Sequence, residues 1–476
     1  MVSVLTPRPS ILGPNGRPLA SYDALDTRGR RHMPATRIHS EDAILGTKDR
    51  RKLTSQVRDL RRNYELVAWA IRCHLDYVSS FKWQATTEDQ GLNDRLEAWM
   101  AEVTTAGNFD AAGRHNLSRF VRLMEAARTD QGDVWALKQN DGTIQAIEGD
   151  RVALPTAGKV PSGFSRDRFT NGVITDRRGK VSQVAVCDRE AGQLSRCRVL
   201  NGRFFWQLGY FDRFDQVRGV SPLSSAINRF RDTYEGMELA LAKSKVEQLF
   251  ALVITRNGDE AIGDVSATTD EFGNPVESSY QVDFGRGPQT LDLDPGDDAK
   301  FLKSESPGGQ FESFEKLSIM LALKSLDIPF SFFDESHTNF YGSRGGLQQY
   351  VKSAEAKRAD VARFLRSWTM WRMAVDIRDR RLDIGTRELA DAAGEWRAVG
   401  IPWWDPSKEI DGHLKAIAAG LDNPQRIAKS TTGTDYFENL ELRAQAEQRA
   451  RDLGVELSWT ASNQQQLTSG EESDDE

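Results

Sequence analysis

The densest set of possible metal ligands in the sequence is Asp292, Asp294, Asp297 and Asp298. Closely spaced carboxylates are the ligands that Ca²⁺ and Mg²⁺ prefer. These four lack the spacing and the terminal glutamate of a calcium-binding loop. A solvated acidic turn is the favoured interpretation, and we expect no metal or other cofactor.

Motifs for phosphate, zinc or serine chemistry are missing from the sequence. Neither Gly308-Gly309 nor Gly345-Gly346 is followed by the Lys-Ser or Lys-Thr of a phosphate-binding loop. The histidines are scattered, and neither an HExxH pair nor a GxSxG elbow is present. Arg344-Gly345-Gly346 occurs once, and a flexible hinge is favoured over a nucleic-acid-binding RGG segment. We therefore expect a protein that is not an enzyme.

Tryptophans are concentrated near the C-terminal third of the chain. Trp368 and Trp371 lie on one predicted helix, and Trp403-Trp404 follows. Aromatic rings can stack on nucleic-acid bases, but at helical spacing they more often fill a core or a subunit interface. Core or interface is the favoured interpretation.

The composition excludes several classes of protein. The 476 residues carry a formal net charge of −7, which disfavours a basic surface that clamps nucleic-acid phosphates. Cys73, Cys187 and Cys197 form neither a disulfide framework nor a CxxC pair, so we expect a reducing compartment and buried, small apolar side chains. No apolar run approaches the length of a membrane span.

Hydrophobic periodicity predicts helices in the first part of the chain. Residues 1 to 45 have little periodicity and predict an extended arm. A long helix is expected over about 55–81, and two shorter helices through Leu96–Val103 and Leu117–Ala127. Asn140-Asp141-Gly142 between two apolar runs then predicts a hairpin, within a small antiparallel β subdomain over 132–211.

Two long helices are expected to bracket an insertion. Ser221-Pro222 is typical of a helix start, and helical spacing continues from there to about residue 250. Residues 256–309 are rich in Gly, Asp, Ser and Pro, after which a helical face resumes until Pro329. The apolar face of the first helix consists of Leu223, Ile227, Phe230, Tyr234, Met237 and Leu241.

The segment between the second of these helices and the next long helix is predicted to be a loop. Pro329 ends one helix, and Gly342, Gly345 and Gly346 lower helical propensity before the next. A final helix should end at Gly454, and an acidic, disordered tail follows. The predicted loop contains Asp334, Glu335, Ser336, His337, Thr338, Asn339, Phe340 and Tyr341.

The order of these parts resembles the lambda-type family of portal proteins from tailed bacteriophages. Each matching motif is short, but their order and spacing over about residues 50–455 are specific. Departures are Phe340-Tyr341-Gly342-Ser343, where the family usually has Tyr-Ser-Ser, and the insertion at 256–309. The matching residues are Gly132-Asp133-Val134, Ile147 to Val152, Arg218 to Leu223, Asn228 to Asp232, Glu238 to Lys245, Pro295-Gly296-Asp297, Ile328-Pro329-Phe330, Asn339 to Arg344 and Trp404 to Glu409.

The resemblance implies an α+β portal-protein fold that is mainly α-helical, with long stem and tunnel helices, a small antiparallel β wing subdomain and a β/loop clip. The implied divisions are an arm (1–45), a wing (46–222), a stem helix (223–250), the clip (251–310), a second stem helix (311–328), a tunnel loop (329–343), a long helix with wing return (344–425), a crown (426–458) and an acidic tail (459–476).

The resemblance also implies a function and partners. Identical subunits, typically twelve, would form a ring at one capsid vertex, through which double-stranded DNA enters during packaging and leaves during infection. The partners would be the terminase large subunit, head-completion or adaptor proteins and the major capsid protein, with no membrane. The location would be the virion, after assembly in the host cytoplasm.

An acidic cluster in the implied clip would lie where terminase docks or DNA passes: Asp292, Asp294, Asp297, Asp298 and Glu305. An equally weighted interpretation is that these are solvated loop charges. Two other functions stay open at this point. One is a different capsid or tail structural ring protein, and the other is a subunit of a DNA-processing enzyme with metal-binding carboxylates.

Overall fold

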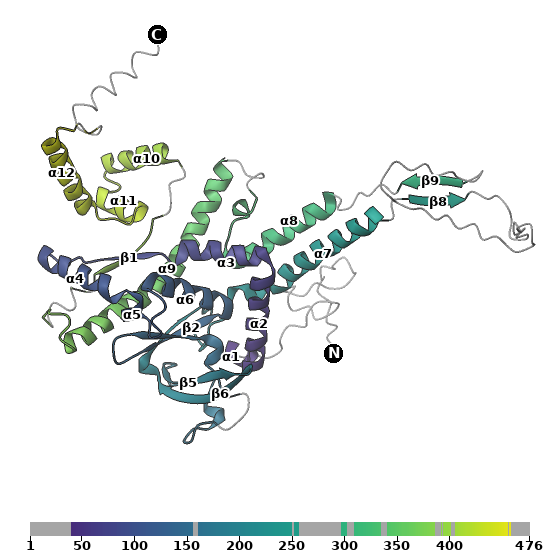
Figure 1. Ribbon diagram of the computed structural model, residues 1–476, viewed down its shortest axis with the longest axis horizontal. Helices are drawn as coiled ribbons and strands as arrows, with labels where there is room; N and C mark the ends of the chain where they lie inside the picture. The colour runs from purple at the N-terminus through teal and green to yellow at the C-terminus, as the bar shows by residue number, and fades with distance from the viewer. Residues whose placement is uncertain are drawn as a thin grey trace, which may run out of the picture. The chain divides into compact units, whose positions relative to one another are not determined.

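The computed structural model describes residues 40–155, 160–249, 252–256, 297–301, 309–334, 340–385, 392, 394–400, 405–455 and 457. The chain divides into two compact units. Unit 1 consists of Met1–Ser55, Ala85–Ser221 and Ser367–Ala393, and unit 2 of Gln56–Gln84, Pro222–Arg366 and Gly394–Glu476. The fold is α+β and mainly α-helical with small antiparallel sheets, as predicted (Figure 1).

Unit 1 combines helices with two three-stranded antiparallel sheets. The sheets have the strand orders β3-β2-β7 and β4-β5-β6. The helices are α1 (Glu41–Ile44), the start of α2 (Thr47–Asn63), α4 (Gln90–Val103), α5 (Ala106–Phe109), α6 (Leu117–Gln131) and the end of α9 (Phe340–Arg378). The strands are β2 (Asp133–Lys138), β3 (Ile144–Glu148), β4 (Val173–Thr175), β5 (Val181–Glu190), β6 (Gln193–Asn201) and β7 (Phe205–Gly209).

The predicted hairpin and β subdomain are confirmed. β2 pairs with β3 in the register Lys138↔Ile144, around a turn in which Gly142 has φ +91°. An Asp141 carboxylate oxygen accepts a hydrogen bond from the Thr143 amide at 2.9 Å and fixes that turn. Strands β4 and β6 were not foreseen, because β4 has only three residues and the sequence of β6 lacks a regular alternation of apolar and polar residues.

The core of unit 1 is formed by buried side chains from its sheets and from its helices. One cluster consists of Trp135, Ile147, Val152, Val173, Val184, Val186 and Phe205. On the helical side, the ring of Phe109 lies 5.1 Å from that of Phe120 and 4.9 Å from that of Trp368. Trp368 is fully buried, which confirms the core interpretation for this tryptophan.

Helix α6 offers a clean test of local stability. Its N-cap is Asn116, an exposed residue whose side chain accepts a hydrogen bond from the Arg119 amide at 3.0 Å. Asn116→Ala is expected to lower the free energy of unfolding by about 1 kcal/mol, measured by urea unfolding. Asn116→Asp keeps the cap, and its free energy of unfolding should lie within a few tenths of a kcal/mol of the parent's. Equal losses in both variants would show that capping is not the reason.

Unit 2 holds the remaining elements. Its two sheets are β1 with β10 and β8 with β9, both antiparallel. The helices are the rest of α2, α3 (Glu65–Val78), α7 (Ile227–Leu249), α8 (Gly309–Leu323), most of α9, α10 (Pro406–Ala418), α11 (Pro424–Thr431) and α12 (Tyr436–Leu453). The strands are β1 (Phe81–Gln84), β8 (Leu252–Arg256), β9 (Asp297–Phe301) and β10 (Glu395–Ala398).

The single helix predicted over 55–81 is wrong in one respect, because the chain breaks at Tyr64. This residue adopts an extended conformation (φ −122°, ψ 111°) between α2 and α3. Its ring packs 6.4 Å from that of Phe230 and 5.3 Å from that of Tyr234, and its hydroxyl lies 3.1 Å from that of Thr233. Packing against α7 therefore overrides the helical period.

The end of the chain differs from the prediction in its number of helices. The last helix ends at Gly454 in the left-handed conformation (φ 66°), as predicted. The helices α10 and α11 were not predicted. Each has a proline in its first turn after a capping residue, Asp405 for α10 and Asn423 for α11. These Asp-Pro and Asn-Pro pairs were the available sequence signals.

The first long helix starts later than the sequence indicated. Residues Pro222–Ser225 form a 3-10 turn, and α7 begins at Ile227. The Ser221 hydroxyl donates to the Thr129 carbonyl at 2.6 Å, which fixes this residue within unit 1. The second helix, α8, covers Gly309–Leu323 and is followed by a 3-10 turn, instead of continuing to residue 328.

Candidate functional site

The short motifs of the sequence converge on a buried ion pair in unit 1. Asp133 and Arg218 are separated by 85 positions and are both 1% exposed or less. Arg218 Nε donates to Asp133 Oδ2 at 2.7 Å and Nη2 donates to Oδ1 at 2.8 Å. Burial alone would raise the pKa of Asp133, but the charge and hydrogen bonds of Arg218 outweigh this and lower it.

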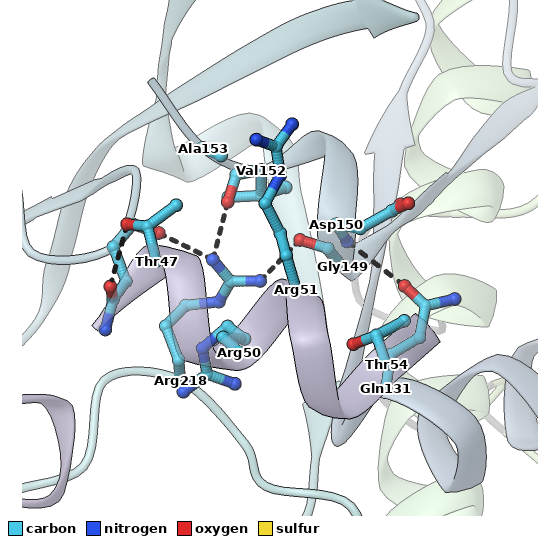
Figure 2. Close-up of a pocket in the computed structure, with 11 residues that line it drawn as sticks. Thr47, Arg50, Arg51, Thr54, Gln131, Gly149, Asp150, Val152, Ala153 and Arg218 are labelled. Atoms are coloured by element: carbon cyan, nitrogen blue, oxygen red, sulfur yellow. Dashed lines mark hydrogen bonds between the residues drawn. The ribbon is translucent and has the colours of Figure 1, made fainter. Parts of the chain in front are cut away.

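Backbone carbonyl groups satisfy the other donors of Arg218. Its guanidinium donates to Gly149 O, Val152 O and Asn171 O, each at 2.6 Å (Figure 2). One side chain thus joins two segments to β2, the 3-10 turn from Gly149 to Val152 and the turn at Asn171. The ion pair therefore holds parts of unit 1 together as well as neutralising its own charge.

Two motif glycines are required by this packing. Gly132 has φ +91°, and a Cβ there would lie 2.4 Å from the carbonyl oxygen of Gly219. The amide of Gly219 in turn donates to Asp133 Oδ2 at 3.0 Å. The pairs Gly132-Asp133 and Arg218-Gly219 are therefore held together by close backbone packing and by hydrogen bonds.

A second arginine and an aspartate complete the cluster. Arg50 donates to the carbonyl of Gly219 and lies 3.7 Å from Asp42, and both side chains are buried. Burial, together with the charge of Arg218, lowers the pKa of Arg50 to about 10. Asp42 also accepts from the Val217 amide at 2.6 Å. This corrects only the end of the arm expected over 1–45, where Glu41–Ile44 form α1 and Asp42 is buried; residues 1–39 lie outside the described residues.

Sequence reasoning missed Asn171 at this cluster. It has φ 48° and precedes Gly172, and its amide group donates to the Leu45 carbonyl at 3.1 Å. The Asn-Gly pair was the available signal for a turn. The cavity beside these residues has a volume of about 10 Å³, so it has room for one water molecule and not for a substrate (Figure 2).

Unit 2 contains the two helices that bracket the insertion. In chain order these are α7, β8, β9 and α8, and α7 and α8 pack side by side (Figure 1). Strand β8 pairs with β9 from Leu252↔Phe301 to Arg256↔Asp297. This element order agrees with the sequence-based expectation of two helices that bracket an insertion.

The predicted face of the first stem helix is only partly buried. Leu223, Ile227 and Phe230 are buried, whereas Met237 is 41% and Leu241 56% exposed. Tyr234, between them, is half-buried. The apolar stripe therefore continues onto a part of α7 that no described residue covers.

Helix α8 has an exposed apolar stripe as well. Phe314, Leu317 and Leu321 are spaced by three and four residues, and so share one face. They are 62%, 49% and 42% exposed, while Ile319, Ala322 and Leu323 on another face are buried. We call Phe314, Leu317 and Leu321 the α8 stripe.

Helices α7 and α8 approach closely at Gly236 and Glu315. A Cβ at Gly236 would lie 2.5 Å from Glu315 Oε1. Glu315 is 6% exposed, and among the described residues its Oε2 has no hydrogen-bond partner. Burial raises the pKa of this carboxyl group.

The raised pKa of Glu315 predicts that the free energy of unfolding depends on pH. Because its pKa is higher in the folded state, stability is lost as the pH rises from the usual 4.5 through the folded pKa. Glu315→Gln should remove this loss and so make the protein more stable than the parent at neutral pH. Urea unfolding at acidic and neutral pH measures both. A variant that keeps the parent's pH dependence would contradict this assignment.

The acidic cluster is only partly within the described residues. Asp297 and Asp298 are the first residues of β9, so the expected acidic turn is wrong for these two. Strand pairing with Arg256 and Thr255 sets their backbone. Asp292, Asp294 and Glu305 lie outside the described residues. Among the described residues, no group of three or more His, Cys, Asp or Glu could hold a metal ion.

The predicted tunnel loop is shorter than expected. Phe340 and Tyr341 belong to α9, so their assignment to the loop is wrong. A Cβ at Gly346 would lie 3.1 Å from Pro329 Cβ, so this glycine lets the helix pack against the segment before the loop, and packing outweighs its low propensity. Tyr341 is 81% exposed. Outside the described residues lie Glu335, Ser336, His337, Thr338 and Asn339.

Asp334, at the start of the predicted loop, lies within the described residues. It lies 3.5 Å from Lys316 of α8, which links the start of the segment to the second stem helix. Farther along, Arg344 lies 3.8 Å from Glu409 of α10. An ion pair therefore joins the start of the predicted loop to α8, and another joins the first part of α9 to α10.

Further apolar side chains are exposed on α10 and α12. They include Ile410 and Leu414 on α10, and Phe437 and Leu440 on α12, between 42% and 58% exposed. None of the described helices is long and apolar enough to cross a membrane. These exposed groups are thus available for contacts with other protein surfaces.

Comparison with solved structures finds gene transfer agent particles and a phage portal protein. The neck of an empty gene transfer agent (GTA) particle is 12% identical, with 85% of this chain and 96% of that chain covered and a TM-score of 0.47. A chain in the virion of a native GTA particle is 11% identical. The match covers 80% of this chain and 98% of that chain, with a TM-score of 0.46. An HK97-family phage portal protein from Corynebacterium diphtheriae is 12% identical. The match covers 72% of this chain and 94% of that chain, with a TM-score of 0.28. At these values the likeness adds no argument of its own.

Comparison with curated proteins gives no match. The family model described as "Phage portal protein, lambda family" matches residues 28–358. This range contains Asp133, Arg218 and both stem helices, and it covers more than half of the 476 residues. The chain therefore belongs to the lambda family of phage portal proteins.

Proposed function

We propose that this chain forms a closed homo-oligomeric ring, typically of twelve subunits, at one vertex of a phage capsid. Double-stranded DNA passes through the ring during packaging and ejection. The observation that carries the proposal is the exposed α8 stripe, together with Met237 and Leu241 of α7. Apolar faces of this kind are stabilised when they are buried between subunits.

Cyclic symmetry accounts for apolar faces on both stem helices. In a head-to-tail ring each subunit presents two different surfaces, one to each neighbour. The α8 stripe would supply one surface and α7 the other. The exposed residues of α12 and α10 would extend the same contacts in the crown over 426–458 and the wing return over 344–425.

The charge of the subunit favours passage of DNA over tight binding. Each phosphate contact to Lys or Arg releases counterions and adds affinity that would resist sliding. A net charge of −7, repeated in every subunit, opposes such contacts. The channel segment would be Asp334 to Asn339, with the exposed Tyr341 at the start of the long helix.

The clip over 251–310 is the proposed docking site for the terminase large subunit and later for head-completion or adaptor proteins. The wing would contact the major capsid protein. The subunits would assemble in the host cytoplasm and end in the virion. Neutralising Asp292, Asp294, Asp297, Asp298 and Glu305 to the corresponding amides should weaken terminase docking while rings persist. Unchanged docking would mean that these are solvated charges only.

The channel role is tested by deleting residues 335–339, which leaves both Asp334 and α9 in place. Rings should still assemble, because neither stem helix is altered. Packaging of DNA, or its retention in filled heads, should fall. A second variant that replaces the five residues with glycine and serine separates loop length from loop chemistry. Full packaging by the deletion variant would reject the channel role.

A further inference from the structure

Cys187 and Cys197 lie on neighbouring strands of one hairpin. Cys187 is on β5 and Cys197 on β6, which pair in the antiparallel direction. The register is Val186↔Arg198 before an irregularity and Asp188↔Ser195 after it. The single residue Cys187 therefore lies opposite Arg196 and Cys197, in a β-bulge.

The bulge is visible in the backbone. Arg196 has φ 43°, a left-handed conformation that non-glycine residues seldom adopt. In antiparallel sheets, opposed Cα atoms are about 4.5 to 5.5 Å apart. Disulfides join Cα atoms about 4.4 to 6.8 Å apart. The two cysteines lie on adjacent, paired strands, and this is the range of separations in which a disulfide can form.

The two sulfur atoms lie on the same side of the hairpin. Cys187 Sγ donates to the Ala153 carbonyl oxygen at 3.1 Å, and Cys197 Sγ lies 3.9 Å from the same oxygen. Both sulfurs therefore lie beside one carbonyl group, and the remaining packing comes from Ala153 and Leu194.

The two thiols differ in exposure and acidity. Cys187 is fully buried, whereas Cys197 is partly exposed. The neighbouring thiol of Cys187 lowers the pKa of Cys197. The thiol of Cys197, together with burial, raises the pKa of Cys187. An accessible thiol that ionises more readily, next to a buried second thiol, is the arrangement of an attacking and a resolving cysteine.

We propose that Cys187 and Cys197 are a redox modification site that forms an intrachain disulfide on contact with a small-molecule disulfide such as glutathione disulfide. The Cys197 thiolate attacks one sulfur of the small disulfide and releases one thiolate. Cys187 then loses its proton and attacks Cys197 Sγ, which expels the second thiolate. The two cysteines lose two electrons, and one small disulfide is reduced to two thiols.

The timing of this oxidation rests on the proposed function, although the chemistry does not. A subunit made in a reducing cytoplasm keeps both thiols. A virion released from the cell meets more oxidising surroundings, where the new bond closes the β5–β6 hairpin. The amide hydrogens of this hairpin should then exchange about tenfold more slowly, because the cross-link restricts local opening.

The test treats the folded full-length protein with glutathione disulfide and maps peptides under non-reducing conditions. The expected result is a Cys187–Cys197 cross-link, with Cys73 left free because burial raises the pKa of its thiol to about 11. Cys187→Ser should stop at a glutathione adduct on Cys197. Cys73→Ser is the matched control and should cross-link like the parent.

Two results would overturn the proposal. One is that both thiols of the folded parent stay free under conditions that oxidise a model dithiol. The other is that Cys197 of the parent keeps a stable glutathione adduct with no cross-link. Both are read from the parent protein, so a variant that fails to fold does not affect them. Failure of ring assembly would leave the cross-link unchanged, which separates this proposal from the proposed function.

Discussion

Asp133→Asn is expected to lower the free energy of unfolding by about 3–5 kcal/mol, because it leaves the charge of Arg218 buried without its partner. Arg218 cannot lose its proton, and it is 1% exposed. Its hydrogen bonds to Gly149, Val152 and Asn171 are all to neutral carbonyl groups. Urea unfolding followed by circular dichroism measures the loss.

Asp215→Asn is the matched control for this change. Asp215 lies 3.2 Å from Arg213, and both side chains are more than two-fifths exposed. An exposed ion pair of this kind contributes less than about 1 kcal/mol. A similar small loss for Asp133→Asn would show that the buried pair does not hold unit 1 together.

Leu317→Glu in the α8 stripe is expected to prevent ring assembly while each subunit stays folded. Leu317 is 49% exposed in the single chain, so a glutamate there remains hydrated and has little effect on the monomer. In a ring the carboxylate would be buried at every subunit interface, at an effective penalty of several kcal/mol each. Sedimentation should show monomer at concentrations where the parent is oligomeric.

Leu317→Met is the control for this second change, because it keeps the volume and apolar character of the side chain. This variant should assemble like the parent. Circular dichroism of Leu317→Glu should match that of the parent subunit. If Leu317→Glu still forms rings of normal size, the α8 stripe is not part of the subunit interface.

Local patterns predicted the elements whose causes lie within a few residues. The Asn140-Asp141-Gly142 turn and the Gly454 helix end both depend on backbone conformations that their own residue types favour. The break at Tyr64 depends on contacts with Phe230 and Tyr234, more than 160 positions away. The pairing of β1 with β10 joins segments that are even farther apart, and neither has a strong period of its own.

The same distinction applies to the functional residues. The motifs around Asp133 and Arg218 were visible in the sequence, but their contact across 85 positions required the folded chain. Phe340 and Tyr341 were assigned to a loop because the nearby glycines have low helical propensity. The packing of Gly346 on Pro329, which the sequence does not show, outweighs that propensity. The Cys187–Cys197 pair depended on a bulge whose key residue, Arg196, has no typical bulge identity.

The most direct test of the account is the mass of the purified full-length protein in solution, measured across salt and protein concentration. A ring-forming portal subunit should give a single closed oligomer whose mass is an integer multiple of 53.4 kDa, and images of it should show one rotational symmetry around a central channel. A stable 53.4 kDa monomer under all of these conditions would contradict the account.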